Sequence, residues 1–178
     1  MKKVAIQGQA ASFHDIAARR FFGDDIETVN FDLPFRNVFD ALGSGEYDAA
    51  VVAIENSLYG SINEVYDLLL EYKTTIVGEV YLHISQCLVG FPGTKLADIK
   101  EVHSHPVALA QCEDFLDDTL QHAERFEHND TAGSVADIKK WGDPSRAAIA
   151  SRAAAELHGM NVLAEEIETN KQNYTRFV

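Results

Sequence analysis

Basic side chains are scarce in this sequence. Its 178 residues include 15 lysines and arginines against 28 aspartates and glutamates, which gives a formal net charge of −13. A charge of this sign repels nucleic acids and anionic membrane surfaces, so we expect neither as a partner. An anionic ligand would have to be held locally, by one or two basic side chains and by the partial positive charge at helix N-termini.

Cysteines and long apolar runs are scarce as well. The 2 cysteines, Cys87 and Cys112, are typical of a protein from a reducing compartment, and we expect both to be buried and unpaired. The 7 histidines are scattered, without the Cys/His spacing of a metal site, so no metal is expected. No segment approaches the length of a membrane span, and Val4–Ile6 is too short for the apolar core of a signal peptide. The expected location is therefore cytoplasmic.

Short apolar runs alternate with segments of helical periodicity, which predicts an α/β fold. The expected strands cover residues 4–6, 26–31, 49–54, 101–102, 123–126, 147–150 and 162–163. The run 49–54 is continuously apolar, as in a strand that is buried on both faces. The apolar run 75–89 is unusually long, and we interpret it as one or two strands that cross from one lobe of the protein to another.

Small polar residues recur where strands are expected to pass into helices. They are Ser12, Ser57, Ser61, His105 and Thr131. Some have an ordinary explanation, since Ser61–Glu64 has the pattern of a capping box and Thr131 could be a helix N-cap. Ligands of open parallel sheets bind at the carboxyl ends of strands, however, and Asn56 and Ser57 have no evident capping role. Gln111 lies among apolar residues of its helix and needs a polar partner, from the protein or from a ligand.

The closing stretch Asn173–Phe177 places a hydroxyl, a permanent cation and an aromatic ring side by side. Thr175 can donate a hydrogen bond, and the guanidinium of Arg176 matches the two oxygens of a carboxylate. The alternative is a final strand in which Tyr174 and Phe177 are packed and Arg176 is solvated. The polar residues upstream favour a role in a site.

Six groups of residues, in order along the chain, resemble motifs of the prephenate dehydratase catalytic domain. They are Gly8–Phe13, Glu55–Ser57 with Gly60–Ser61, His105–Cys112, Asp130–Ala132, Ala148–Ser151 and Asn173–Phe177. The sequence departs from the family pattern at four positions, where Gln9, Ala11, His14 and Val107 replace the usual Pro, Gly, Ser and Gln. The resemblance extends over essentially the whole chain.

This resemblance implies a two-lobed α/β fold like that of type II periplasmic binding proteins, with the active site in the cleft between the lobes. Lobe 1 would comprise residues 1–78 and 163–178, and lobe 2 residues 79–162, each boundary being approximate. The C-terminal ACT domain that usually follows in the family, and that binds phenylalanine, is not expected within this chain. Family members are commonly dimers, so a homodimer is expected.

The implied reaction converts prephenate to phenylpyruvate, with loss of carbon dioxide and water and without a cofactor. Thr175 would supply the catalytic hydroxyl. The other implied catalytic residues are Asn56, Gln111 and Glu55. The implied substrate contacts are Arg176, Ser12, Ser57, Ser61, His105, Thr131 and Phe177. Two alternatives stay open: an arogenate dehydratase acting on the aminated substrate, and a module on the same fold that binds an aromatic or dicarboxylic acid without turnover.

Overall fold

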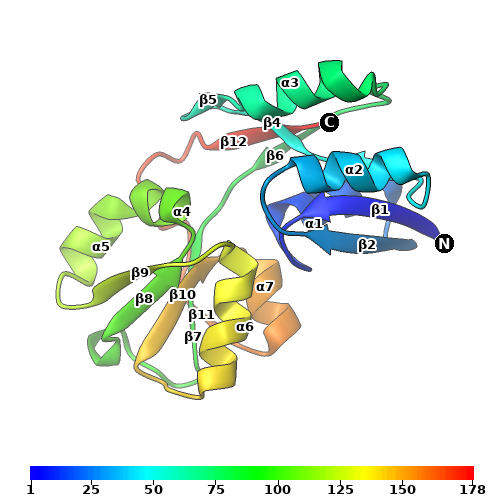
Figure 1. The fold of residues 1–178 in the computed structure, drawn as a ribbon. Coiled ribbons are helices and arrows are strands. Elements are labelled where there is room, and N and C mark those ends of the chain that lie inside the picture. The colour runs from blue at the N-terminus through cyan, green and yellow to red at the C-terminus, as the bar shows by residue number, and fades with distance from the viewer. The chain divides into compact units, whose positions relative to one another are not determined.

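In the computed structural model, which describes residues 1–178, the chain forms two compact units. Unit 1 comprises Met1–Ile84 and Gln172–Val178, and unit 2 comprises Ser85–Lys171. The chain therefore passes between the units twice, and the lobe boundaries expected near 78 and 162 precede the two crossings along the sequence. Both units combine helices with sheets (Figure 1), which confirms the predicted α/β class.

Unit 1 contains a parallel sheet of three strands in the order β2-β1-β3. The strands are β1 (Lys2–Gln7), β2 (Ile26–Phe31) and β3 (Ala49–Val51), and the helices that pack on them are α1 (Phe13–Phe22) and α2 (Arg36–Ser44). Alternate side chains of β1 point to opposite faces, so that Val4 and Ile6 pack with α1 whereas Ala5 packs with α2. Burial of both faces explains why the centre of this strand, residues 4–6, is continuously apolar.

A second sheet of unit 1 is antiparallel and has the strand order β5-β4-β12-β6. Its strands are β4 (Ala53–Asn56), β5 (Gly60–Ser61), β6 (Val80–His83) and β12 (Tyr174–Phe177), and α3 (Asn63–Tyr72) contacts β4. The C-terminal β12 thus lies between two strands from the first half of the chain. It is the red arrow beside β4 and β6 in Figure 1.

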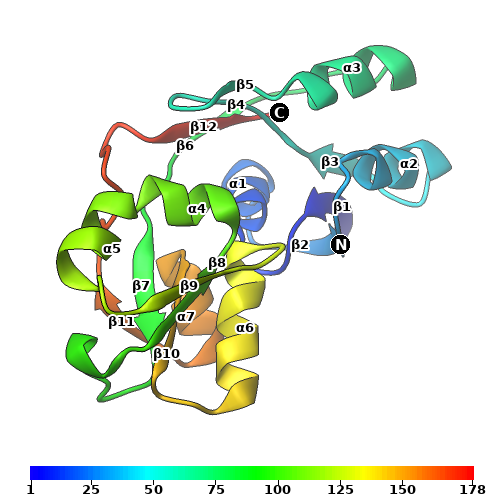
Figure 2. The ribbon, with the colours of Figure 1, turned by 60° about the vertical axis from the view of Figure 1, so that its left-hand side comes forward.

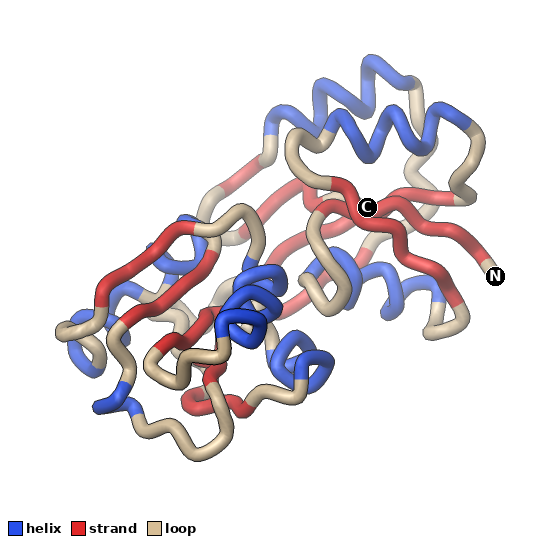
Figure 3. The backbone as a smooth tube through the Cα atoms, turned by 60° about the horizontal axis from the view of Figure 1, so that its bottom comes forward, coloured by secondary structure: helices blue, strands red, loops and turns tan.

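The predicted single strand 49–54 is wrong, because the chain changes sheets at Val52. Residues before it belong to β3 and residues after it to β4. The N–H and C=O groups of Val52 pair with the backbone of Val178 at N···O distances of 3.0 Å, so the end marked C in Figure 3 lies against this break. The backbone N–H and C=O groups of Val52 therefore have hydrogen-bond partners, although the strand pairing of neither sheet continues through this residue.

The predicted capping box at Ser61–Glu64 is also wrong. Ser61 lies in β5, and the residue that precedes α3 is Ile62, whose side chain makes no capping hydrogen bond. Ser61 pairs in register with Glu55 of β4. Ser61 therefore belongs to the β4–β5 hairpin, whereas Asn63 and Glu64 are the first residues of α3.

Unit 2 is built on a five-stranded mixed sheet with the order β11-β7-β10-β8-β9. The strands are β7 (Cys87–Gly90), β8 (Glu101–Ser104), β9 (Glu124–Glu127), β10 (Arg146–Ala150) and β11 (Asn161–Ala164). The helices are α4 (Pro106–Gln111), α5 (Glu113–Thr119), α6 (Thr131–Trp141) and α7 (Arg152–His158), with a 3-10 turn η1 (Leu96–Asp98). Helices α4 and α5 cover one face of the sheet, and α6 and α7 the other (Figure 2).

The four strands expected in this unit are present as β8 to β11. The long apolar run 75–89 contains two strands, β6 and β7, which belong to different units. Cys87 and Cys112 are buried and free, as predicted. None of the helices combines the length and the apolar character needed to cross a membrane.

His14 joins α1 to the start of β4. Its Nε2 atom accepts a hydrogen bond from the N–H of Ala53 at 3.2 Å, and its ring packs against Phe35 and Phe177 at centroid distances of 5.9 and 5.0 Å. Burial lowers the pKa of His14 from 6.5 to about 4. The neutral ring is therefore the form that the fold accepts.

We predict that this histidine makes stability depend on pH. Between pH 6.5 and pH 4 the unfolded chain binds a proton at His14 that the folded chain does not, so the free energy of unfolding falls as the pH falls through this range. His14→Gln, which cannot titrate, should show a shallower fall in urea denaturation at pH 7, 6 and 5. The exposed His122 provides the matched control, His122→Gln, and a wild-type slope in His14→Gln would contradict the prediction.

Candidate active site

Thr175 and Asn56 lie opposite each other on β12 and β4. Residues paired in this way share a face of the sheet, and the Nδ2 atom of Asn56 donates to the Oγ1 atom of Thr175 at 3.0 Å. Thr175 retains 8% of its surface exposed. The structure thus brings together two residues that the sequence predicts to be catalytic, although they are separated by 119 positions along the chain.

The side-chain amide of Asn56 can take only one orientation. Its Oδ1 atom accepts hydrogen bonds from the N–H groups of Leu58 and Tyr59, at 3.0 and 3.1 Å. Its Nδ2 atom must therefore be the donor to Thr175. Since the hydroxyl oxygen of Thr175 accepts this bond, its own O–H proton is available for another acceptor.

Ser57 fastens the chain segment that precedes Thr175. Its Oγ atom donates to the carbonyl of Gln172 at 2.7 Å and accepts from the N–H of Tyr174 at 2.9 Å. Its own N–H donates to the carbonyl of Tyr174 at 2.8 Å. Ser57 is predicted from the sequence to contact substrate, but in the structure its hydroxyl forms hydrogen bonds to the backbone of the residues before and after Asn173.

Asn173 is a residue of this site that the sequence reasoning missed. It is completely buried, and its Oδ1 atom accepts from Asn56 Nδ2 at 2.8 Å. The signal was present in the motif, since Asn173 lies two positions before Thr175. Its contact with the site is made through Asn56, which lies more than 100 residues away and cannot be identified from the motif alone.

Three predicted site residues lie on the opposite face of the same sheet. Arg176 is paired in register with Glu55 on one side, and Glu55 with Ser61. Successive residues of a strand point to opposite faces, so the side chain of Arg176 points away from that of Thr175. The Nε and Nη2 atoms of Arg176 lie 2.8 and 2.5 Å from Glu79, and this hydrogen-bonded carboxylate raises the pKa of Arg176.

Phe177 is packed in the core of unit 1. Its exposed fraction is 2%, and its ring meets that of His14 edge to face. It belongs to the apolar cluster that includes Ile6, Ala17 and Leu82. In this structure the aromatic ring of the closing motif anchors β12 to the parallel sheet and α1.

Ser12 is the N-cap of α1 and is buried. Its Oγ atom accepts from the N–H of Asp15 at 3.3 Å, while the Asp15 carboxylate accepts from the N–H of Ala11 at 2.9 Å. Ala11, where the family pattern has Gly, adopts φ 64, a left-handed conformation that costs roughly 1–2 kcal/mol for a residue with a Cβ atom. Ala11 therefore keeps a backbone conformation that glycine adopts more easily, although the glycine itself is replaced.

Unit 2 holds the remaining predicted residues. Gln111 is buried, and its Oε1 atom accepts from Gln86 Nε2 at 3.3 Å, which supplies the polar partner that the sequence predicts. His105 is the N-cap of α4, with Nδ1 accepting from the N–H of Val107 at 3.2 Å, and burial lowers its pKa. Thr131 is not a cap, because Asp130 caps α6. The hydroxyl of Thr131 therefore has no capping role.

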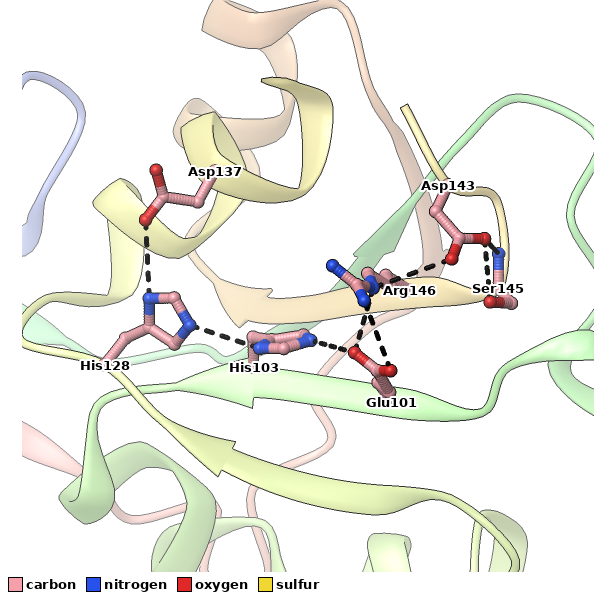
Figure 4. Close-up of polar contacts among 7 residues, drawn as sticks. All are labelled: Glu101, His103, His128, Asp137, Asp143, Ser145 and Arg146. Atoms are coloured by element: carbon pink, nitrogen blue, oxygen red, sulfur yellow. Dashed lines mark hydrogen bonds and ion pairs between the residues drawn. The ribbon is translucent and has the colours of Figure 1, made fainter. Parts of the chain in front are cut away.

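A second polar cluster of unit 2 links β8, β10, α6 and the residue that follows β9 (Figure 4). Its hydrogen bonds and ion pairs join Glu101, His103, His128, Asp137 and Arg146. His103 lies in the middle, with Nε2 at 3.0 Å from Glu101 Oε2 and Nδ1 at 3.1 Å from His128 Nε2, and burial lowers its pKa. No three His, Cys, Asp or Glu residues in the structure are arranged to hold a metal ion. We interpret this cluster as a structural tie between elements of unit 2.

Comparison with known proteins gives a consistent result. A family model described as prephenate dehydratase matches residues 4–178. Arogenate dehydratase 2 of Petunia hybrida is 42% identical over 176 residues, covering 99% of this chain and 44% of the relative. A bifunctional N-acyl-homoserine lactone acylase/prephenate dehydratase of Komagataeibacter europaeus is 35% identical over 178 residues, with coverage of 98% and 60%.

A solved structure is similar over the same length. The crystal structure of prephenate dehydratase in complex with L-Phe from Arthrobacter aurescens has a TM-score of 0.88 and 31% identity, and the match covers 98% of this chain and 58% of that one. The chain therefore spans about half the length of the proteins it matches. The family match extends over nearly every residue, Thr175 and Asn56 included. This chain belongs to the prephenate dehydratase family.

Proposed function

We propose that this chain is the catalytic part of a prephenate dehydratase, a lyase of phenylalanine biosynthesis that converts prephenate to phenylpyruvate, carbon dioxide and water. The observation that carries the proposal is the hydroxyl of Thr175, which Asn56 orients as a hydrogen-bond donor at a position where the family has its catalytic hydroxyl. No cofactor is part of the proposal. The direct experiment is to mix the protein with prephenate and follow phenylpyruvate formation against the spontaneous rate.

The chemistry requires little of the protein beyond binding and one donor. In prephenate, the bond between the ring and its carboxylate breaks, and the electron pair enters the ring as the C–O bond to the 4-hydroxyl breaks. The ring becomes aromatic, carbon dioxide leaves, and the departing hydroxide takes up a proton to form water. A threonine hydroxyl is a weak acid, so Thr175 would stabilise the departing oxygen by a hydrogen bond that strengthens in the transition state.

The remaining predicted residues are proposed to hold the substrate. Gln111, with Thr131 and His105, would contribute an amide, a hydroxyl and an imidazole, and Ser12 would contribute the N-terminus of α1. Glu55 and Ser61 would contact the part of the substrate that Arg176 holds, because these residues lie on the same face of the sheet, and Phe177 would support the site from the core. Ser57 would act chiefly on the backbone around Asn173, because its hydroxyl is already bonded there.

Replacement of the Thr175 hydroxyl should reduce turnover far more than binding. We expect Thr175→Val, which keeps the shape, to lower kcat about 100- to 1000-fold with little change of KM, since one preorganised donor typically contributes that much. Thr175→Ser retains a hydroxyl and is the matched control. Steady-state kinetics with prephenate measure both constants. Near-normal turnover of Thr175→Val would remove Thr175 from the mechanism.

Arg176 is proposed to bind a substrate carboxylate, and the competing partner is Glu79. The guanidinium would have to leave Glu79 to do so, because both of its bonding nitrogens already contact one oxygen of that carboxylate. It would also have to reach the substrate from the face of the sheet opposite Thr175. We expect Arg176→Lys to raise KM several-fold with a small effect on kcat, since lysine lacks the planar fork. Glu79→Gln should free the guanidinium and leave KM unchanged or lower. An unchanged KM in Arg176→Lys would show that Arg176 does not bind the substrate and serves only in the ion pair with Glu79.

A second candidate function is arogenate dehydration, favoured by the 42% identity to a relative named arogenate dehydratase 2. The chemistry at the ring is the same, and the substrates differ only in the side chain, where an amine replaces the keto oxygen. Comparison of kcat/KM for prephenate and arogenate would decide between them. No product above the spontaneous rate with either substrate would instead favour a binding module.

We further propose a homodimer and a cytoplasmic location. The exposed face of the antiparallel sheet carries Tyr81 and Tyr174, and large exposed aromatic side chains favour association between chains. The free buried cysteines Cys87 and Cys112 favour a reducing compartment. Size-exclusion chromatography with light scattering measures the mass, and a monomer at micromolar concentration would contradict the dimer.

A further inference from the structure

Asn173 presents an arrangement that packing alone does not explain. Its Oδ1 atom accepts from Asn56 Nδ2 at 2.8 Å, and its backbone carbonyl accepts from the N–H of Ile84 at 2.8 Å. Its own Nδ2 atom is buried and has no hydrogen-bond partner. An unpaired buried donor is destabilising, so an aliphatic side chain would serve a purely structural role better.

The unpaired donor follows from the direction of the hydrogen bonds around Asn56. The N–H groups of Leu58 and Tyr59 hold its Oδ1 atom, so its Nδ2 group faces three acceptors. They are Asn173 Oδ1 at 2.8 Å, Thr175 Oγ1 at 3.0 Å and, more distant, the carbonyl of Tyr174 at 3.3 Å. A flipped Asn173 amide would bring two NH₂ groups face to face. The oxygen of Asn173 must therefore point to Asn56, and its nitrogen is left without an acceptor.

We propose that Asn173 is a positioning residue, which holds the nitrogen end of the Asn56 amide and so keeps the Thr175 hydroxyl available as a donor. This inference rests on the proposed function of Thr175. Two backbone N–H groups fix one end of the Asn56 amide, and Asn173 fixes the other. With Asn173 Oδ1 accepting one Nδ2 hydrogen, the second is directed to Thr175 Oγ1 at 3.0 Å, which is a shorter contact than the 3.3 Å to the carbonyl of Tyr174. Thr175 then keeps its own proton for the departing oxygen of the substrate.

A double-mutant cycle tests this role. Asn173→Ala should lower kcat at least about tenfold and change KM less than about twofold. The loss in kcat should be smaller than the about 100- to 1000-fold expected for complete loss of a hydrogen-bond donor, because the Thr175 hydroxyl is still present. In the Thr175→Val background the same substitution should cost nothing further, because the group it positions is gone. Equal losses in both backgrounds would show a structural role and overturn the proposal. Asn161→Ala, at an exposed position of β11, is the matched control and should leave kcat unchanged.

A second measurement does not depend on turnover. The side-chain NH₂ signal of Asn56, identified by its absence in Asn56→Asp, should exchange slowly with solvent in the wild-type protein and faster in Asn173→Ala. Unchanged exchange would overturn the proposal. If the wild-type protein does not convert prephenate, the proposed function fails, whereas this measurement still decides whether Asn173 holds Asn56.

A further variant covers the case in which Asn173→Ala does not fold. Asn173→Asp keeps a side-chain oxygen for Asn56 and replaces only the unpaired nitrogen. The slow exchange of the Asn56 signal should persist in Asn173→Asp. Its loss in that variant, or fast exchange already in the wild-type protein, would overturn the proposal.

Discussion

The hydrogen bonds of the Asn56 side chain connect two segments of unit 1 that are distant in sequence, residues 56–59 and residues 173–175. The oxygen of this amide closes the turn after β4, and its nitrogen reaches Asn173 and Thr175 on the returning C-terminal segment. Because both ends of the amide are bonded, its donor and acceptor groups cannot exchange places. The direction of these bonds decides that Thr175 offers a proton and not a lone pair. The chemistry that we propose follows from that direction.

The pleat of β12 imposes a second constraint on the closing motif. Thr175 and Phe177 point to the side where the core lies, whereas Tyr174 and Arg176 point to the exposed side. Arg176 meets Glu79 and the ring of Tyr81 there. Three neighbouring residues of one motif therefore lie in three environments: a polar site, an ion pair and an apolar core. A single short strand provides all three because alternate residues face opposite ways.

Much of this architecture could be predicted from the sequence. The alternation of apolar runs and helical periodicity identified the α/β class, and the resemblance to the family motifs pointed to Thr175 and Asn56. The change of sheets at Val52 could not be predicted, because it depends on pairing with Val178, and a continuous apolar run is equally compatible with one strand. The same limit applies to Ser57 and Asn173, whose partners are more than 100 residues away. Local patterns specify an element and its buried side, but long-range partners appear only when the chain has folded.

The position of β12 has a consequence for how the protein is made. Residues 85–171 form a unit of their own, so all strands of the unit 2 sheet are present once residue 171 has been synthesised. The antiparallel sheet of unit 1 is still incomplete at that point, since β4 and β6 become neighbours of a common strand only when residues 174–177 arrive. Until then β4 and β6 expose strand edges able to pair with other chains. The parallel sheet of β1, β2 and β3 has all its strands by residue 51, whereas the strand that carries the proposed catalytic hydroxyl completes the antiparallel sheet last.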